Sequence, residues 1–333
     1  MFDNKSILIT GGTGSFGKKF TETILSKYSQ IKRLVIYSRD ELKQYEMKQK
    51  WSEKDCPQIR YFIGDVRDRQ RLKRACKEID IVVHAAALKQ VDAAEYNPDE
   101  CIKTNISGAQ NVIDCAIECK VNKIIALSTD KACSPSNLYG ATKLVSDKLF
   151  VAANNITGTK DIKFSVVRYG NVMGSRGSVI PFFLEKAKSG ILPVTDKRMT
   201  RFNISLEDSV EMVLFAICHS LGGEIFVPKI PSYRIMDVVK AISSDCKVNL
   251  IGIRPGEKIH EEMISESDGS STIEFEKYYA ILPSIEMNYS KKEYMEHHKA
   301  KPVKQGFVYC SDKNNEWETV KNLKKLIKKM LNK

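Results

Sequence analysis

The octapeptide Thr10-Gly11-Gly12-Thr13-Gly14-Ser15-Phe16-Gly17 directly follows a short apolar run at residues 6–10 and precedes a helix-compatible segment from about residue 18 to residue 28. Its three spaced glycines allow a tight turn and a close approach of the backbone to a pyrophosphate, while the next helix offers its first amides to anionic oxygens. A glycine pattern alone predicts only a turn, but a position between strand and helix predicts a dinucleotide-binding site. The predicted contacts from this turn are Gly11, Thr13, Gly14, Ser15, Phe16 and Gly17.

Apolar runs of strand length recur along the first half of the chain and alternate with helix-compatible segments. The further runs lie at residues 33–37, 59–63, 79–84, 123–127 and 163–168, and the two clearest helices at 98–120 and 138–154. This alternation predicts an α/β protein with a doubly wound, parallel, Rossmann-type sheet. We expect a dinucleotide-binding Rossmann domain at 1–170, joined by part of 204–230, and a smaller mixed α/β substrate-binding part at 171–333. Residues 265–315 carry too little pattern for a prediction.

The composition is typical of a globular protein, with 333 residues, 42% hydrophobic and 28% charged. No run approaches the roughly 20 apolar residues that a membrane span requires. The chain enters its first strand-like run at once, and we expect no secretory signal. The nine cysteines are scattered without a Cys-x-x-Cys pair, which favours reduced thiols and no metal site. These features predict a cytoplasmic protein with no membrane span.

The net charge of +12 is uneven, because residues 321–333 hold six lysines and no acid. Apolar residues recur there at helical spacing, so the segment predicts an amphipathic helix with a lysine face. A solvated face is the favoured interpretation, and an anionic membrane surface or an acidic partner remain alternatives. A basic nucleic-acid-binding or regulatory protein rests on net charge alone and would show salt-sensitive binding. We predict no nucleic-acid partner.

The ends of the second, third and fourth strands predict the rest of the cofactor site. Ser38 and Arg39 suit the 2′-phosphate of NADP, whereas an acid immediately after this strand would favour NAD. Asp40 follows them and is expected to cap the next helix, so NADP is the preferred cofactor. Asp65 could meet the adenine amine, and Asn105 is expected to face solvent or to order the site. The further predicted contacts are Asp65, Val66, Ala85, Ala86, Ala87, Lys89 and Asn105.

Ser128-Thr129-Asp130-Lys131 follows the fifth strand, and Tyr139-Gly140-Ala141-Thr142-Lys143 lies on the helix after it. The carboxyl ends of parallel strands face the ligand crevice, so these groups are predicted to surround a bound ligand. Tyr139 and Lys143 are four residues apart and share one helix face. Lys143 is expected to bind the cofactor ribose and to lower the pKa of the phenol, so that Tyr139 can act as a base near neutral pH.

Thr129 and Tyr139-x-x-x-Lys143, with the glycine turn, resemble the sugar-nucleotide-modifying short-chain dehydrogenase/reductases. The resemblance implies that these three residues suffice to move hydrogen between a sugar and a nicotinamide ring, so Asp130 and Lys131 predict a further task. Oxidation of a sugar 4-hydroxyl to a ketone would acidify the proton at C5. Lys131 as base could remove that proton, and Asp130 as acid could protonate the departing 6-hydroxyl while hydride returns to C6. The sum is loss of water without net redox change.

This chemistry requires a partly neutral Lys131, which Lys143 and the nicotinamide would encourage, and an Asp130 whose pKa burial has raised. The simpler alternative is that Asp130 caps a turn and Lys131 is a surface lysine.

Two loop motifs beyond the sixth strand each contain an arginine, Met199-Thr200-Arg201-Phe202 and Arg254-Pro255-Gly256-Glu257-Lys258. The planar fork of arginine suits bidentate contact with a diphosphate. The two motifs together therefore predict contacts to an anionic substrate.

The glycine turn, the Thr129 strand end and Tyr139-x-x-x-Lys143 together resemble the extended, sugar-nucleotide-modifying branch of the short-chain dehydrogenase/reductase superfamily. Five further motifs resemble the UDP-N-acetylglucosamine 4,6-dehydratases over about residues 5–265. They are His84-Ala-Ala-Ala-Leu-Lys89, Thr129-Asp-Lys131, Asn171-Val172, Met199-Thr-Arg-Phe202 and Arg254-Pro-Gly-Glu257. With Tyr139 and no membrane span, the chain resembles the C5-inverting form. Membrane-bound, C5-retaining relatives typically carry methionine at that position and have transmembrane helices.

The resemblance implies UDP-N-acetylglucosamine as substrate and NADP as a bound, recycled cofactor. It implies Lys131 as proton abstractor at C5, Asp130 as acid at C6 and Tyr139 at the 4-hydroxyl. It also implies the opening step of bacterial pseudaminic acid synthesis for flagellin glycosylation, and a homo-oligomer built from dimers, often a hexamer. Implied substrate contacts are Lys89, Asn171, Arg176, Val179, Thr195, Arg201, Arg254 and Glu257, with Val172 on the cofactor.

A UDP-sugar 4-epimerase or C4 reductase of the same fold remains the alternative. Such an enzyme would have no use for the acid and the amine beside Thr129.

Overall fold

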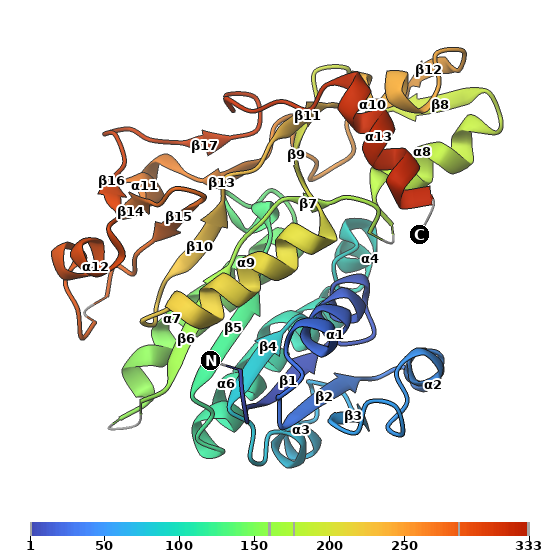
Figure 1. Cartoon of the computed structure of the whole chain (residues 1–333). Helices are drawn as coiled ribbons and strands as arrows, with labels where there is room; N and C mark the ends of the chain where they lie inside the picture. The colour runs from blue at the N-terminus through green and yellow to red at the C-terminus, as the bar shows by residue number, and fades with distance from the viewer. Residues whose placement is uncertain (1, 159–160, 176, 286, 332–333) are drawn as a thin grey trace.

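The computed structural model describes residues 2–158, 161–175, 177–285 and 287–331 (Figure 1). Within these ranges one large sheet holds β1 (Ser6–Thr10), β2 (Arg33–Ser38), β3 (Ile59–Ile63), β4 (Ile81–His84), β5 (Lys123–Leu127), β6 (Lys163–Val167), β10 (Ile225–Pro228), β14 (Thr272–Glu274), β15 (Tyr278–Ile281) and β16 (Lys301–Pro302). Their order is β16-β14-β15-β10-β6-β5-β4-β1-β2-β3. Neighbours from β3 to β10 pair in parallel, and β15, β14 and β16 continue the sheet antiparallel.

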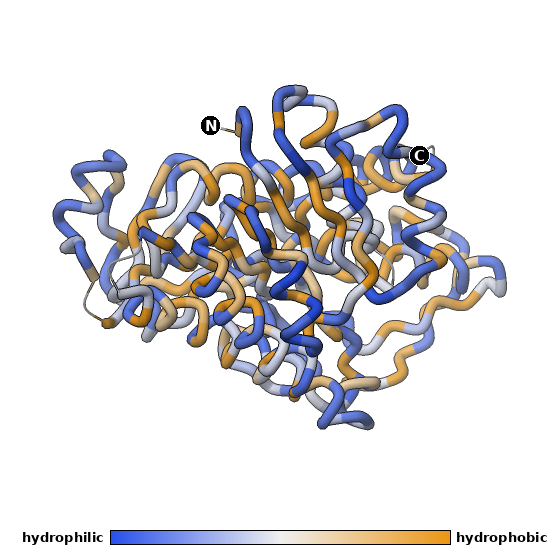
Figure 2. The backbone as a smooth tube through the Cα atoms, turned by 90° about the horizontal axis from the view of Figure 1, so that it is seen from below, coloured by the Kyte–Doolittle hydropathy of each residue, from blue (hydrophilic) through white to orange (hydrophobic). Residues whose placement is uncertain are grey.

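Helices cover both faces of this sheet, which confirms the predicted doubly wound fold. The helices are α1 (Ser15–Lys27), α2 (Glu41–Lys50), α3 (Arg69–Ala75), α6 (Gly108–Glu118), α7 (Leu138–Ala152) and α9 (Leu206–His219). α1 and α9 pack together on one face, whereas α3, α6 and α7 pack in a row on the other. Strand residues such as Ile7, Val83 and Ile125 are buried between these layers. Figure 2 shows the same arrangement as hydrophobic stretches through the middle of the molecule and hydrophilic ones mainly at its margin.

The glycine turn is tighter than the sequence predicted, because α1 begins at Ser15 and not near residue 18. Gly11 has a φ of +65°, and a Cβ there would lie 2.9 Å from the backbone of Ala86. Gly17 lies inside the first turn of α1, where a Cβ would lie 2.3 Å from the carbonyl oxygen of Gly12. The helix can start this early only because position 17 has no side chain.

The predicted regular helix at 98–120 is wrong in its middle. The segment after α4 (Val91–Tyr96) consists of α5 (Pro98–Ile102), a π-helical turn (Lys103–Ser107) and α6. A π-turn inserts an extra residue into the helical ladder and rotates the side chains that follow. Asn105 lies in this turn and is buried, with 1% of its surface exposed, so its side chain faces neither solvent nor the outer helix surface.

The second half of the chain does not leave the large sheet at one point. After β7 (Asn171–Val172), α8 (Val179–Ala187), β8 (Ile191–Val194) and β9 (Thr200–Ile204), the chain returns to the sheet through α9 and β10. It leaves again through β11 (Ser232–Arg234), α10 (Ile235–Ile242) and β12 (Lys247–Leu250). β13 (Glu262–Ile264) and β17 (Tyr309–Cys310) form a separate pair, while β14, β15 and β16 come from the stretch that carried no clear pattern. α11 (Glu266–Gly269) and α12 (Lys291–His298) connect these strands.

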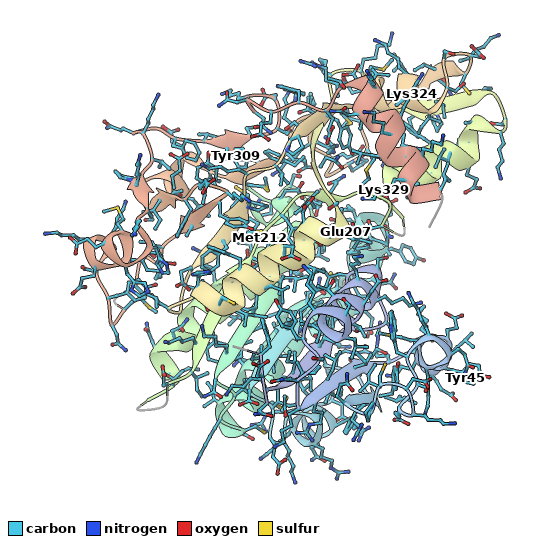
Figure 3. The ribbon with its side chains drawn as sticks, viewed as in Figure 1. Tyr45, Glu207, Met212, Tyr309, Lys324 and Lys329 are labelled. Carbon is cyan, nitrogen blue, oxygen red and sulfur yellow. The ribbon has the colours of Figure 1, made fainter. Side chains whose placement is uncertain are left out.

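The predicted basic helix is α13 (Val320–Leu331), and Lys333 lies outside the described residues. Leu323 and Ile327 are buried in a second apolar core with residues of α8 and α10. The lysines lie on the exposed face, where Figure 3 labels Lys324 and Lys329. At its end Met330 contacts the loop after β7, since a Cβ on Gly174 would lie 2.5 Å from the Met330 Sδ. No helix in the described ranges is long and apolar enough to cross a membrane.

Gly17→Ala tests the glycine turn. The new methyl group clashes with the Gly12 carbonyl, so we expect the free energy of unfolding to fall by about 1–3 kcal/mol and dinucleotide binding to weaken. Chemical denaturation and calorimetric titration with NADP measure the two effects. Ser26→Ala on the same helix is the control and should change the unfolding free energy by less than about 0.5 kcal/mol. A Gly17→Ala protein that matches this control would contradict the steric argument.

Candidate functional site

A cavity of about 920 Å³ lies at the carboxyl ends of β1, β4 and β5. The glycine turn lines one end, and the loop that carries Arg254 lines the other. Ligands of open parallel sheets bind at this edge, beside the point where the strand order reverses. Here the reversal lies between β1 and β4.

Most of the residues predicted from the sequence line this cavity. Those predicted as cofactor contacts are Gly11, Thr13, Gly14, Ser15, Phe16, Gly17, Ser38, Arg39, Asp65, Val66, Ala85, Ala86, Ala87, Lys89, Tyr139, Lys143 and Val172. Those predicted as catalytic or substrate contacts also include Thr129, Lys131, Asn171, Val179, Thr195, Arg201, Arg254 and Glu257. Asn105 and Asp130 lie behind the cavity wall, and Arg176 lies outside the described residues.

Asn105 supports the cavity wall and does not line it, which corrects its prediction as a cofactor contact. Its Oδ1 accepts from the Leu88 backbone N–H at 2.8 Å. Its Nδ2 donates to the Leu88 carbonyl at 2.9 Å and to Thr142 Oγ1 at 3.0 Å. The side chain therefore fixes the loop after β4 against α7. Because it holds Leu88, it also fixes the backbone position of the next residue, Lys89.

The end of the cavity beside Asp65 contains ion pairs. Arg67 donates to Asp65 Oδ2 from Nη2 at 2.7 Å and from Nε at 2.9 Å, and Arg39 lies 3.6 Å away. Burial alone would raise the pKa of Asp65, but Arg67 outweighs it and the pKa is lowered. Asp40 caps α2 as predicted, with Oδ1 accepting from the Lys43 backbone at 3.0 Å. Arg67 has no motif around it, and sequence reasoning missed it.

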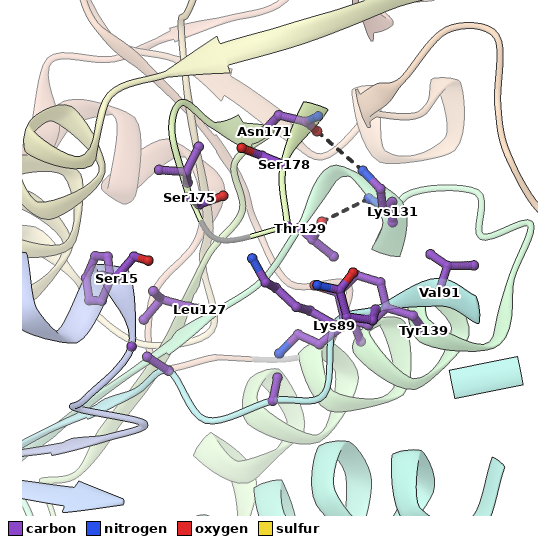
Figure 4. Close-up of a pocket in the computed structure, with 18 of the residues that line it drawn as sticks. Ser15, Lys89, Val91, Leu127, Thr129, Lys131, Tyr139, Asn171, Ser175 and Ser178 are labelled. Carbon is purple, nitrogen blue, oxygen red and sulfur yellow. Dashed lines mark hydrogen bonds between the residues drawn. The ribbon is translucent and has the colours of Figure 1, made fainter. Parts of the chain in front are cut away.

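Asp130 and Lys131 lie on a short 3₁₀ turn after β5, with Thr129 as its N-cap. Lys131 Nζ donates to Asp130 Oδ1 at 3.0 Å and to Asn171 Oδ1 at 3.4 Å. Figure 4 shows Lys131 joined by hydrogen bonds to Asn171 and Thr129, with Lys89 and Tyr139 close by. Asp130 is completely buried, so neither the surface lysine nor the capping aspartate of the simpler alternative describes this pair.

Glu261 is a buried member of the site that sequence reasoning missed. Its Oε1 lies 3.4 Å from Lys131 Nζ and 3.5 Å from Arg201 Nε. It lines the cavity and is 2% exposed. The sequence feature that could have indicated Glu261 is its position, three residues beyond the Arg254-to-Lys258 motif and immediately before β13.

The charges around Lys131 correct the predicted neutral lysine. Burial would lower the pKa of Lys131, but the carboxylates of Asp130 and Glu261 outweigh burial and raise it. The pKa of Asp130 is raised by burial, with a further contribution from Glu261, against the effect of Lys131. The raised Asp130 pKa is as predicted, whereas the pKa of Lys131 is raised and not lowered.

Tyr139 also differs from its prediction. Burial raises the pKa of Tyr139 to about 12, and Lys131 and a hydrogen bond with Thr129 oppose this shift. The cation that most opposes the rise of the phenol pKa is therefore Lys131, in the role that the sequence predicted for Lys143. Burial lowers the pKa of Lys143 itself, while Asp147 one turn further along α7 opposes that shift.

The two predicted substrate arginines have different surroundings. Arg201 is buried and donates to the carbonyls of Thr200 at 2.7 Å, Ile259 at 3.0 Å and Lys258 at 3.0 Å. Its fork therefore supports the loop before β13 and is not open to a diphosphate. Arg254 lies at the mouth of the cavity with its side chain 57% exposed and pairs with Glu257 at 2.9 Å. It can turn towards a bound anion at little cost.

The sheet order, the glycine turn and the Thr129, Tyr139 and Lys143 side chains define a dinucleotide-binding protein of the extended short-chain dehydrogenase/reductase type. The chain belongs to the family described as "Polysaccharide biosynthesis protein", whose model matches residues 7–283.

Two relatives and two solved structures are similar to the chain over much of its length. A protein of Campylobacter jejuni subsp. jejuni serotype O:2 named "UDP-N-acetylglucosamine 4,6-dehydratase (inverting)" is 57% identical, covering 98% of each chain. A protein of Rickettsia akari named "UDP-glucose 4-epimerase" is 41% identical, covering 97% of this chain and 96% of its own. The X-ray structure of Pen from Bacillus thuringiensis has a TM-score of 0.89 at 36% identity and covers 99% of each chain.

DesIV of Streptomyces venezuelae, a dTDP-glucose 4,6-dehydratase solved with NAD bound, has a TM-score of 0.67 at 22% identity. It covers 76% of this chain and 86% of its own, and its likeness bears on the fold alone.

Lys131→Met and Lys143→Met separate the two cations near Tyr139. We expect Lys131→Met to raise the pKa of Tyr139 further and Lys143→Met to change it less, because Lys131 is the cation with the largest opposing effect. Phenolate absorbance is titrated in each variant and corrected with the same variant carrying Tyr139→Phe. If Lys143→Met raises the pKa of Tyr139 more than Lys131→Met does, Lys143 is the cation that acts on the phenol, as the sequence predicted.

Proposed function

We propose that this protein is a UDP-N-acetylglucosamine 4,6-dehydratase of the C5-inverting type, a hydro-lyase that uses a nicotinamide dinucleotide. The observation that carries the proposal is the 3.0 Å contact between Lys131 and Asp130 beside Thr129, Tyr139 and Lys143. The 57% identity with the Campylobacter relative supports the same substrate and the same outcome at C5.

The glycine turn fits a dinucleotide, because a Cβ on Gly11 would collide with the Ala86 backbone and one on Gly17 with the Gly12 carbonyl, so only glycines allow this close turn. Gly14 is the N-cap of α1, so the first amides of this helix point towards a pyrophosphate. When bound, the nicotinamide ring would take the hydrogen and its electron pair from sugar C4 and later return them to C6.

We propose NADP over NAD for this site. Arg39 follows β2 at the cavity edge with its side chain 51% exposed. Its pair with Asp65 is longer than a hydrogen bond, so the guanidinium can turn to a 2′-phosphate. Asp40 is engaged as the cap of α2, which leaves it poorly placed to accept ribose hydroxyls.

The proposed reaction requires four proton transfers, and the side chains of the site account for three of them. The fourth returns an exchangeable proton to the opposite face of C5 and replaces the one that Lys131 removed. Tyr139 accepts the proton of the sugar 4-hydroxyl, with Lys131 and Thr129 favouring the phenolate. Lys131, once neutral, removes the proton at C5. Asp130 supplies the proton that the departing 6-hydroxyl needs. Because Asp130 lies behind Lys131, direct donation requires the lysine to move away from Oδ1 as substrate binds.

A UDP-sugar 4-epimerase is the second candidate, since the Rickettsia relative carries that name. Epimerisation at C4 needs the hydrogen transfer and Tyr139, but no acid or base at C5 and C6. In such an enzyme a fully buried Asp130 with a raised pKa would reduce the stability of the fold and have no role in the reaction. This observation favours dehydration.

Further parts of the proposal rest on the resemblance. We propose that the enzyme acts in the cytoplasm as a homo-oligomer built from dimers, such as a hexamer. Its product would enter pseudaminic acid synthesis for flagellin glycosylation. We also propose that residues 1–170 form the cofactor half, and 171–333 mainly the substrate half, with α9 and β10 contributing to the first.

Lys131→Ala tests the assignment. We expect product formation to fall below detection, because no other amine contacts Asp130 Oδ1 in the described ranges. The assay is incubation with UDP-N-acetylglucosamine in deuterium oxide, followed by NMR. The wild-type chain should lose water and carry deuterium at an inverted C5.

Lys148→Ala is a control at an exposed lysine of α7 and should retain wild-type turnover. Dehydration by Lys131→Ala, or wild-type product without deuterium at C5, would exclude Lys131 as the base. Interconversion of 4-epimers without loss of water would favour the second candidate.

Arg39→Ala tests the cofactor preference. Loss of a charge-assisted contact to the 2′-phosphate should weaken NADP binding about tenfold or more and leave NAD binding nearly unchanged. Calorimetric titration with both dinucleotides measures the ratio. Equal weakening of NADP and NAD would show that Arg39 does not distinguish them.

A further inference from the structure

Four charged side chains form a buried cluster at the substrate side of the cavity. Asp130, Glu261 and Arg201 are 0%, 2% and 8% exposed, and the Lys131 side chain is 25% exposed. Lys131 contacts both carboxylates, at 3.0 Å to Asp130 and 3.4 Å to Glu261. Glu261 in turn contacts Arg201 at 3.5 Å. With every member ionised, two cations and two anions balance.

Each cation in this cluster has a definite counter-charge. Arg201 is permanently charged, and Glu261 is the acid within 4 Å of its guanidinium among the described residues. Buried charges persist only where they are compensated. If Glu261 is assigned to Arg201, the remaining Asp130–Lys131 pair is neutral by itself and holds one transferable proton.

Two carboxylate oxygens in the cluster have no hydrogen-bond partner, Asp130 Oδ2 and Glu261 Oε2. An unpartnered buried carboxylate oxygen is costly, and protonation of its carboxyl group reduces that cost. Asp130 can therefore accept a proton more readily than a fully hydrogen-bonded carboxylate could.

We infer that Glu261 is a positioning residue for the proposed dehydration, which balances Arg201 and holds Lys131 so that one proton can pass from Lys131 to Asp130 without changing the charge of the cluster. This inference rests on the proposed function. In the transfer an N–H bond of Lys131 breaks and an O–H bond forms on Asp130. The products are a neutral amine and a protonated carboxyl, and no oxidant, reductant or solvent proton is needed.

This transfer resolves a conflict between the unliganded structure and the proposed chemistry. The carboxylates of Asp130 and Glu261 raise the pKa of Lys131 and so favour the charged amine, yet this amine must be neutral to act at C5. Asp130 must carry a proton to act at C6. A single transfer over 3.0 Å prepares both groups together, and the contact with Glu261 keeps the Lys131 amine beside the sugar position.

The direction of the pH effect follows from the neighbours of the cluster. Besides its own four members, Lys89, Tyr139, Tyr233 and Lys258 face it. The negative charge of Glu261 raises the pKa of Lys131 and of Asp130. Removing that charge lowers the pKa of both, so the singly protonated pair exists over a more acidic range.

Glu261→Gln tests the inference in the whole chain with NADP and UDP-N-acetylglucosamine. We expect both limbs of the kcat–pH profile to move to lower pH by about one unit. At the wild-type optimum kcat should fall about tenfold or more, with KM within about threefold. Glu262→Gln is the matched control, because the adjacent Glu262 contacts Ser134 at 2.8 Å and does not line the cavity. It should leave the profile unchanged.

The double variant Glu261→Gln/Arg201→Met removes one charge of each sign. We expect its pH profile to return towards that of the wild type even if kcat stays low, and it carries the test should Glu261→Gln alone fail to fold. A Glu261→Gln profile that matches the wild type would overturn the inference and leave the proposed function standing. So would a double variant shifted to lower pH by about one unit. Absence of dehydration by the wild-type chain would overturn both.

Discussion

A completely buried carboxylate, that of Asp130, is the constraint on which the site depends. Such a group needs compensation, and its two chain neighbours supply it: the Thr129 hydroxyl at 2.9 Å and the Lys131 amine at 3.0 Å. Backbone must also pack closely here, because a Cβ on Gly170 would lie 2.5 Å from the Phe202 side chain and 3.5 Å from Asp130 Oδ2. The geometry of β5, β6 and β9 around Asp130 is therefore tightly fixed.

The parts of the site that could be predicted from the sequence are those fixed by local pattern. The glycine turn, the strand ends and the Tyr139–Lys143 spacing each follow from neighbours in the chain, and all of them reach the cavity. Glu261 could not be found this way, because it and its partners Lys131 and Arg201 come from three different elements. Its charge acts together with that of the adjacent Asp130 to raise the pKa of Lys131, opposite to the expected direction, and Lys131 has the largest opposing effect on the pKa of Tyr139.

The fold shows the same division between local and non-local information. The parallel strands inside the sheet are continuous apolar runs because both faces of each are covered, whereas the edge strand β3 is partly exposed. β14, β15 and β16 are short antiparallel strands at the sheet edge, and their stretch carried no such run. Asn105 could be recognised as polar in a helix, but its π-turn and its bonds to Leu88 depend on a loop seventeen residues away.

The contact between Met330 and Gly174 links the order of synthesis to the completion of the site. The large sheet is nearly finished when β10 emerges from the ribosome, whereas the loop after β7, which follows Asn171, gains its support from α13 about a hundred residues later. A nascent chain can thus fold its parallel strands while the loop after β7 still lacks the support of α13. The glycine turn can therefore reach its final shape before the backbone around Gly174 does.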